Sequence, residues 1–250
     1  MSKVEKRNEF LASEVQELKL NIAYADLLLK EEETDKVTIV AWYEADRADR
    51  YGCELIAGKL YAGEKENGSV VVHTNTDKDA ITVTLPVGMN LKTMELVLGA
   101  GNAKLSNAST KYGEIDLEAG AGKVSADALQ VEGKAEIEAG AGHAEIKNLT
   151  AQKADVTCGV GKLFVSGVIA GDVNVECGVG KVEMHLDADE RDYNYAISCG
   201  VGSVRVNGCK RGGLFGSGSS ITNSGAKGTI SLECGVGNIE LVMEKLPTVQ

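Results

Sequence analysis

The sequence predicts an all-β fold, a parallel β-helix or solenoid whose coils are about 19 residues long and turn at Gly-x-Gly corners. Apolar and polar residues alternate between these corners, as in Gly171-Asp-Val-Asn-Val-Glu-Cys. A fixed period combined with such alternation is typical of stacked repeats rather than of a globular enzyme. The tripeptides begin at Gly99, Gly120, Gly140, Gly159, Gly178, Gly200, Gly216 and Gly235.

Each coil is predicted to contain one strand before its glycine corner and one strand after it. In residues 171–180, Val173 and Val175 alternate with polar residues, so one set of side chains points inward. After the corner the apolar residues are Val182 and Met184, and the alternation has therefore shifted by one residue. Such a shift indicates a sharp bend, and we expect the glycines to supply the positive φ that such bends often need.

The coils are expected to stack in parallel and in sequence order, each strand over its equivalent. Residues 162–177 align without gaps with residues 143–158 and with residues 219–234, which supports a constant register. Extra residues near 187–192 are predicted to form a surface loop. An antiparallel β-sandwich is the alternative, because glycine-rich turns and alternation also suit that fold.

One continuous domain is expected, with an N-terminal tail at 1–16, irregular coils or a cap at 17–98, the regular solenoid at 99–243 and a C-terminal tail at 244–250. A helix over residues 13–30 is an alternative, because Ser13 opens a sequence that resembles a capping box. The two-residue period favours strands instead. The apolar positions of the strands expected within 17–98 are Leu18, Leu20, Ile22, Val37, Ile39, Ala41, Val70, Val72, Ile81, Val83 and Leu85.

Charge and composition restrict the partners and the location. The net charge of −11 argues against binding nucleic acid or anionic lipid and suits a soluble monomer. No apolar run approaches the ~20 residues of a membrane span. The N-terminus lacks the pattern of a signal peptide, so the expected location is cytoplasmic, or the envelope or extracellular space if a leader has been removed.

The cysteines are predicted to pack in the core and not to bind metal. Cys158, Cys177, Cys199 and Cys234 take the same place in four coils, and Cys209 is also expected to point inward. Zinc needs four ligands in a tetrahedron, whereas a straight ladder spreads its sulfurs along a line. Parallel Cβ vectors also fit a disulfide poorly. We therefore expect reduced, buried thiols and no metal or cofactor site.

Two charged columns are predicted on the outside of the coils. We interpret them as solvated faces, although an acidic column is also suited to calcium or a basic partner. The calcium-binding β-roll motif is absent, and the Gly-x-Gly-Lys sequences lack the remainder of a phosphate-binding loop. The columns comprise Asp116, Glu118, Glu136, Glu138, Asp155, Glu176 and Glu233 on one face and Lys123, His143, Lys162 and Lys181 beside the corner.

No catalytic residues are predicted. His73, His143 and His185 are scattered, and Trp42 is the single tryptophan in the sequence. A glycan-active enzyme is the remaining catalytic alternative, and it would require a deep groove with two carboxylates about 5–9 Å apart.

The repeated frame Ile/Val-x-Cys/Ala-Gly-Val/Ala-Gly-Lys/Asn-Val/Ile resembles the bacterial putative-adhesin family of unknown function, as does the Leu-Pro-x-Gly turn at Leu85. The resemblance covers roughly residues 15–243. It implies a single-chain β-solenoid, often associated with the cell envelope, and carries no catalytic motif. The expected function is a non-enzymatic, adhesin-like binding or scaffold module for an unidentified protein or cell-surface ligand. The alternative that the resemblance implies is a regulatory component of an envelope-stress response that acts through a protein partner.

Overall fold

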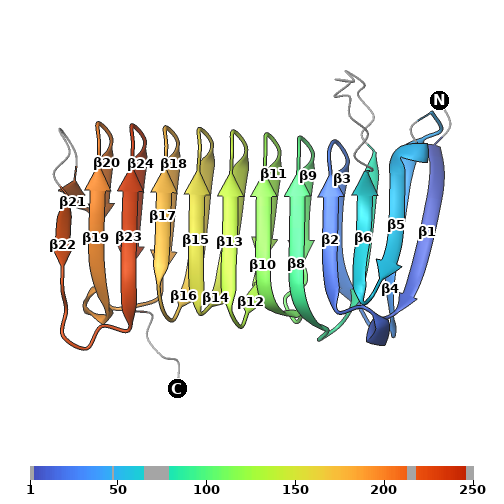
Figure 1. Ribbon diagram of the computed structural model, residues 1–250, viewed down its shortest axis with the longest axis horizontal. Coiled ribbons are helices and arrows are strands. Elements are labelled where there is room, and N and C mark those ends of the chain that lie inside the picture. Colours follow the sequence, from blue (N-terminus) through green and yellow to red (C-terminus); the bar gives the residue numbers. More distant parts are fainter. Residues whose placement is uncertain (1–2, 47, 65–78, 213–217, 246–250) are drawn as a thin grey trace.

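The computed structural model describes residues 3–46, 48–64, 79–212 and 218–245. It is a long stack of β-strands in which each coil crosses the molecule twice (Figure 1). The strands on the two sides form two broad sheets, called sheet I and sheet II below. Three short 3-10 helices, η1 Ala12–Glu14, η2 Ala48–Arg50 and η3 Glu190–Asp192, lie in connections.

Sheet I consists, in order of hydrogen-bonded neighbours, of β5 Tyr51–Ile56, β6 Lys59–Glu64, β2 Glu17–Ile22, β8 Asn90–Leu98, β10 Lys111–Ala119, β13 Lys134–Ala139, β15 Lys153–Cys158, β17 Val173–Cys177, β23 Gly228–Cys234, β19 Tyr193–Cys199 and β22 Ser219–Ile221. Sheet II consists of β1 Lys3–Leu11, β4 Lys36–Glu44, β7 Ala80–Pro86, β3 Asp26–Glu32, β9 Asn102–Ser106, β11 Lys123–Asp127, β14 His143–Ala151, β16 Lys162–Ile169, β18 Lys181–Leu186, β24 Asn238–Met243, β20 Ser203–Val206 and β21 Cys209–Gly212. The short strand β12 Gln130–Val131 pairs with both β10 and β14 and joins the two sheets.

The core lies between the sheets and follows the predicted alternation. In the coil of β17 and β18, Val175 and Cys177 point into the core from sheet I, and Val182 and Met184 point into it from sheet II. All four side chains are buried. The parallel register is constant through the middle of the stack, because Leu117, Ile137, Val156 and Val175 pair in succession. The all-β solenoid is therefore confirmed, and the sandwich is not formed.

The order of coils is sequential in the middle but not at the ends, where the expectation was wrong. The last coil in the sequence, β23 and β24, lies between β17–β18 and β19–β20 (Figure 1). At the other end, β2 lies between β6 and β8, and β3 lies between β7 and β9. A repeat pattern specifies which faces a coil buries, but every coil offers equivalent edges, so the pattern does not determine its neighbour.

The segment after Gly216 is a second correction. Residues 219–234 were expected to form a further parallel coil. β23 Gly228–Cys234 does pair in parallel with β17 and β19, but β22 pairs antiparallel with β19 at Tyr195–Ile221. The tripeptide at Gly216 and the neighbouring Phe215 lie outside the described residues. At this end, β20 and β21 also form an antiparallel hairpin.

The N-terminal region is made of strands rather than a long helix. β2 and β3 occupy most of the segment that resembled a helix, and Leu18, Leu20 and Ile22 are buried as the two-residue period predicted. Residues expected to be a tail form β1, which pairs antiparallel with β4 and so completes the end of sheet II. Val70 and Val72 lie outside the described residues. The boundary of the regular solenoid at 99–243 stays a prediction.

Close backbone approach, not positive φ, explains the corner glycines. The described glycines with positive φ are Gly58, Gly63, Gly88, Gly167, Gly208 and Gly225, all outside the Gly-x-Gly corners. A Cβ added to Gly161 would lie 2.0 Å from the carbonyl oxygen of Gly142 in the preceding coil. The equivalent atom on Gly180 would lie 2.3 Å from the oxygen of Gly161. The expected conformational reason was therefore wrong, and the glycine is required because coils stack backbone against backbone.

Candidate functional site

The predicted cysteine ladder is present in the core. Cys158 pairs in register with Cys177, Cys177 with Cys234, and Cys234 with Cys199. None of the four is more than 2% exposed, and all are free thiols. The same column continues toward the N-terminus through Ala139, Ala119, Leu98 and Ile22.

Burial holds three of these thiols, those of Cys158, Cys177 and Cys234, in the protonated form. It raises the pKa of Cys158 to about 11 and also raises the pKa of Cys177 and of Cys234. Cys234 Sγ also donates a hydrogen bond to the carbonyl oxygen of Gly237 at 3.0 Å. Metals bind the thiolate, so a protonated linear ladder is poorly suited to them. Within the described ranges, no three His, Cys, Asp or Glu side chains are arranged to hold a metal ion.

Cys209 does not belong to the ladder, which corrects the expectation that it points inward. It is exposed, because it opens β21 in the hairpin with β20 and does not follow the regular coil. The hairpin turns at Asn207 and Gly208, both of which have positive φ.

The acidic residues form two adjacent columns on the outer surface of sheet I, as predicted. The first runs through Glu95, Asp116, Glu136 and Asp155, which pair in register. The second includes Glu118, Glu138, Thr157, Glu176, Glu233 and Ser198. We call these two columns, from Glu95 to Asp155 and from Glu118 to Glu233, the acidic columns. Strands of a sheet lie about 4.8 Å apart, so neighbouring carboxylates in a column are held close together.

The electrostatic centre of the acidic columns is Asp116. Burial raises the pKa of Asp116, and the surrounding carboxylates of Glu136, Glu95, Glu118 and Glu138 raise it further. Lys19 pairs with Glu95, and Lys134 lies 2.9 Å from Glu136 and 2.5 Å from Asp155. These two cations pair with members of the first acidic column, Glu95, Glu136 and Asp155.

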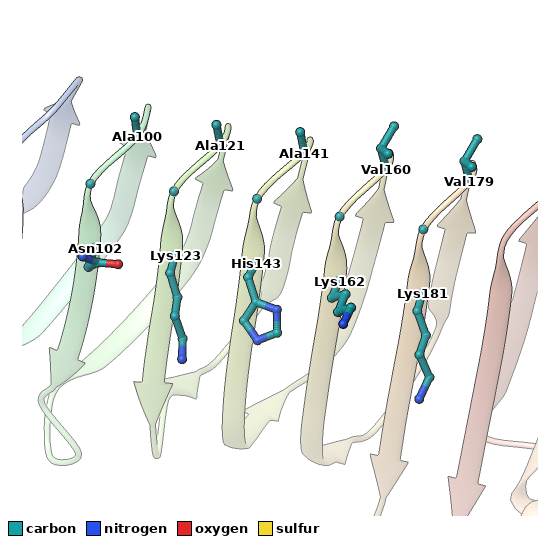
Figure 2. Close-up of a pocket in the computed structure, with 15 residues that line it drawn as sticks. Ala100, Asn102, Ala121, Lys123, Ala141, His143, Val160, Lys162, Val179 and Lys181 are labelled. Carbon is teal, nitrogen blue, oxygen red and sulfur yellow. The ribbon is translucent and has the colours of Figure 1, made fainter. Parts of the chain in front are cut away.

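A long groove follows the Gly-x-Gly edge on the side of sheet II and has a volume of about 710 Å³. Its floor is the glycine backbone, which carries no side chains. Figure 2 shows one wall formed by the outward-pointing Ala100, Ala121, Ala141, Val160 and Val179. The other wall is the column predicted beside the corner, Lys123, His143, Lys162 and Lys181, which the register confirms and extends to Asn102.

The groove is not built to bind phosphate. Its backbone amides donate to the neighbouring coil, for example Lys123 N to Gly101 O at 3.0 Å and Val160 N to Gly140 O at 2.7 Å. Two of its lysines are engaged on sheet II, Lys181 with Glu183 at 2.8 Å and Lys123 with Glu145 at 3.6 Å. On sheet II these lysines are paired with glutamates, whereas the acidic columns of sheet I consist mainly of carboxylates.

A second hollow, which the sequence analysis missed, lies on sheet I beyond the N-terminal end of the acidic columns. Its volume is about 580 Å³, and its lining includes Gly52, Gly63, Ile56, Tyr61 and Glu54. Gly52 and Gly63 face each other across β5 and β6, so the surface lacks side chains there. A glycine inside a strand pattern can mark such a dent, which was the available signal. The hollow has an apolar wall, since Ile56 is 57% and Tyr61 39% exposed.

The described histidines take no part in a catalytic arrangement with the acidic columns. His143 is in the groove wall, and His185 lies 3.1 Å from Glu183 and edge-on to Phe164 on sheet II. His73 lies outside the described residues. The carboxylates of the acidic columns stand on the open surface of sheet I, not in a deep groove. Trp42 is 40% exposed at the N-terminal end of sheet II.

Comparisons with known proteins agree with this fold. The family model described as Toastrack DUF4097 matches residues 15–241. The crystal structure of a putative adhesin from Bacteroides fragilis has a TM-score of 0.56 at 15% identity, over 96% of this chain and 98% of that one. Two further structures are similar at lower TM-scores. They are a putative lipid binding protein from Parabacteroides distasonis (0.47, 16% identity, 95% and 96% covered) and a putative cell adhesion protein from Clostridium sporogenes (0.42, 18%, 97% and 100%).

No curated protein sequence matches the chain. In the part of the chain that the structure describes, no helix is both long enough and apolar enough to cross a membrane.

Proposed function

Since this chain belongs to the Toastrack DUF4097 family, we propose that it is a non-enzymatic, adhesin-like binding module that contacts a basic polypeptide through the acidic columns of sheet I. The observation that carries this proposal is the cluster around Asp116. Its carboxylates stand in register on adjacent coils and are only partly compensated by Lys19 and Lys134.

The charge cluster costs stability, which supports a role in binding. The pKa of Asp116 is higher in the folded state than in the unfolded state. Its contribution to stability is therefore complete below the unfolded pKa and is lost as pH rises and Asp116 ionises. Residues that reduce stability in this way are concentrated at functional sites. A basic partner would neutralise the repulsion, and the electrostatic complementarity would accelerate the encounter.

The stack of coils supports binding by position as well as by charge. The sheet fixes the backbone of these acidic residues, so only their side chains lose freedom when a partner docks. Acidic residues on a mobile loop would lose backbone freedom as well. The flat face therefore presents a preorganised charge pattern.

The test is binding of a fluorescent peptide made of lysine, glycine and serine, followed by anisotropy at several salt concentrations. Replacing Asp116→Asn and Glu138→Gln together should weaken binding by about threefold to tenfold, since exposed pairs contribute ~0.2–1 kcal/mol each. The matched control is Asp127→Asn with Glu240→Gln, which changes net charge equally on sheet II. Equal loss in both variants would mean general attraction to an acidic protein and would refute a binding role for the acidic columns.

A further inference from the structure

The hollow at Gly52 and Gly63 lies on the same surface as the acidic columns. Its strands β6 and β2 belong to sheet I, and β8 and β10 follow directly. Lys19 lines the hollow and pairs with Glu95, which is the first residue of the first acidic column. An apolar dent and a partly compensated cluster of acidic residues are therefore parts of one continuous face.

The shape of the hollow depends on the backbone and is fixed. Gly63 has a φ of 138°, and a Cβ on it would lie 1.9 Å from the carbonyl oxygen of Asn21. No larger residue fits at this position without moving β2. The hollow has about 580 Å³ of space, within the range of ~300–1,000 Å³ that ligand pockets occupy.

The chemistry of the walls favours an apolar side chain. Ile56 and Tyr61 present their side chains to solvent, and the Nζ of Lys59 lies 5.5 Å from the centre of the Tyr61 ring. The lysines nearby are occupied, because Lys59 lies 3.7 Å from Glu17 and Lys19 pairs with Glu95. Glu64 accepts a hydrogen bond from the backbone N–H of Ala23 at 3.1 Å.

We propose that the hollow and the acidic columns together bind an extended basic segment of a polypeptide, with one large apolar side chain of that segment inserted in the hollow, whose apolar wall Ile56 and Tyr61 provide. This inference rests on the proposed function and names the partner more closely. The hollow supplies a fixed anchor point, and the acidic columns select the charge of the residues that follow it.

The spacing of the two features defines the segment. From β6 to β10 there are three strand intervals, about 14 Å, which an extended chain covers in about four residues. Glu136 and Glu138 lie one interval further, about 19 Å or six residues from the anchor. Lysine or arginine is therefore expected about four and six positions from the apolar residue, with uncharged residues over Lys19.

The test uses a labelled twelve-residue peptide of lysine, glycine and serine with one tryptophan at that spacing. A second peptide has serine in place of the tryptophan. The tryptophan peptide should bind the protein about tenfold more tightly, since buried aromatic anchors commonly contribute over 1 kcal/mol. In the variant Ile56→Ser with Tyr61→Ala this advantage should disappear, while salt-dependent binding of the serine peptide is retained. The control is Val179→Ser, which removes an exposed apolar side chain from the opposite groove.

Three outcomes overturn the inference. One is equal affinity of the two peptides for the wild-type protein, and another is an unchanged tryptophan advantage in the Ile56→Ser, Tyr61→Ala variant. The third is equally tight binding of a lysine-free tryptophan peptide, since the acidic columns would then contribute nothing. If neither basic peptide binds, the proposed function itself fails. Circular dichroism and the thermal midpoint of each variant establish that both substituted proteins are folded.

Discussion

The coils from Gly99 to Gly142 and those from Gly159 onward have the same Gly-x-Gly corner but differ in the residue at two positions of the repeat. The earlier coils have Leu98, Ala119 and Ala139 in the core, where the later ones have cysteine. At the exposed tip the earlier coils have alanine, and the later ones have valine. The Cys158 sulfur would lie 2.7 Å from a Cβ on Gly180, so it occupies space beneath the glycine of the next coil.

The difference shows which positions the stacking itself restricts. Both glycines of the corner are retained in both kinds of coil, because carbonyl oxygens of the neighbouring coil approach them. The position before them accepts leucine, alanine or cysteine, since it only fills space in the core. The position between them faces solvent and accepts either alanine or valine.

The largest effect is expected at the corner glycine. Gly180→Ala should lower the free energy of unfolding by about 4 kcal/mol or more, because its Cβ would overlap the oxygen of Gly161 at 2.3 Å. Urea unfolding measures this. Adding Cys158→Ala should not rescue the variant, since the carbonyl remains. As a control, Gly218→Ala should cost little, because its Cβ meets only an oxygen at 3.5 Å. Full rescue by Cys158→Ala would show that the sulfur is what excludes a side chain.

A charge in the core column should be the next most damaging change. Cys177→Asp and Ala139→Asp should each cost about 3 kcal/mol, since both place an unpaired carboxylate among buried residues. The same unfolding experiment compares the two kinds of coil directly. A much smaller loss at Ala139 would mean that water enters the alanine coils, and the common core would then be wrong.

Alkaline pH should affect the cysteine coils selectively. The pKa of Cys158 is raised from 9.0 to about 11, so the folded state holds the proton more tightly than the unfolded state. Stability from this group is complete below pH 9 and falls as pH rises to about 11. Unfolding midpoints measured from pH 8 to 11 should decline less steeply in Cys158→Ala. An identical decline in both proteins would contradict the buried thiol as the cause.

Removing a single sulfur should have a modest effect. Cys177→Ala reproduces the side chain that Ala119 and Ala139 already carry, and it should cost about 1 kcal/mol through lost contacts and a small void. Peptide binding should not change. A loss of binding would connect the ladder to function and contradict its role as packing.

The smallest effect is expected at the tip. Val179 is 58% exposed, so Val179→Ser should alter the free energy of unfolding by no more than about 0.5 kcal/mol. A thermal melt is sufficient to measure it. A clear destabilisation would show that the valines of the later coils stabilise one another along the edge.

Local patterns predicted the coils well because each inward position is repeated along the chain. The burial of Cys177, the register of Asp116 with Glu136 and the column from Lys123 to Lys181 all follow from alternation and period. These features depend only on the face of the strand on which each side chain lies.

Features that depend on contacts between distant segments were not predicted. The insertion of β23 between β17 and β19 depends on which edges meet, and the strands offer nearly equivalent edges. The exposure of Cys209 depends on a hairpin that leaves the coil pattern. The hollow at Gly52 and Gly63 requires two glycines to meet across strands whose pairing is not evident from either one.

The non-sequential stacking of coils at the two ends restricts where the protein can gain coils by duplication during evolution. A coil duplicated at the C-terminus would follow β24, which already has neighbours on both sides in β18 and β20. A coil duplicated among β10 to β18 could insert between two existing coils, because the strands on both sides of it would be parallel and in the same register. Growth by duplication is therefore confined to the interior. Lineages of this chain should differ in length by whole coils there, while the interleaved ends are inherited as fixed units.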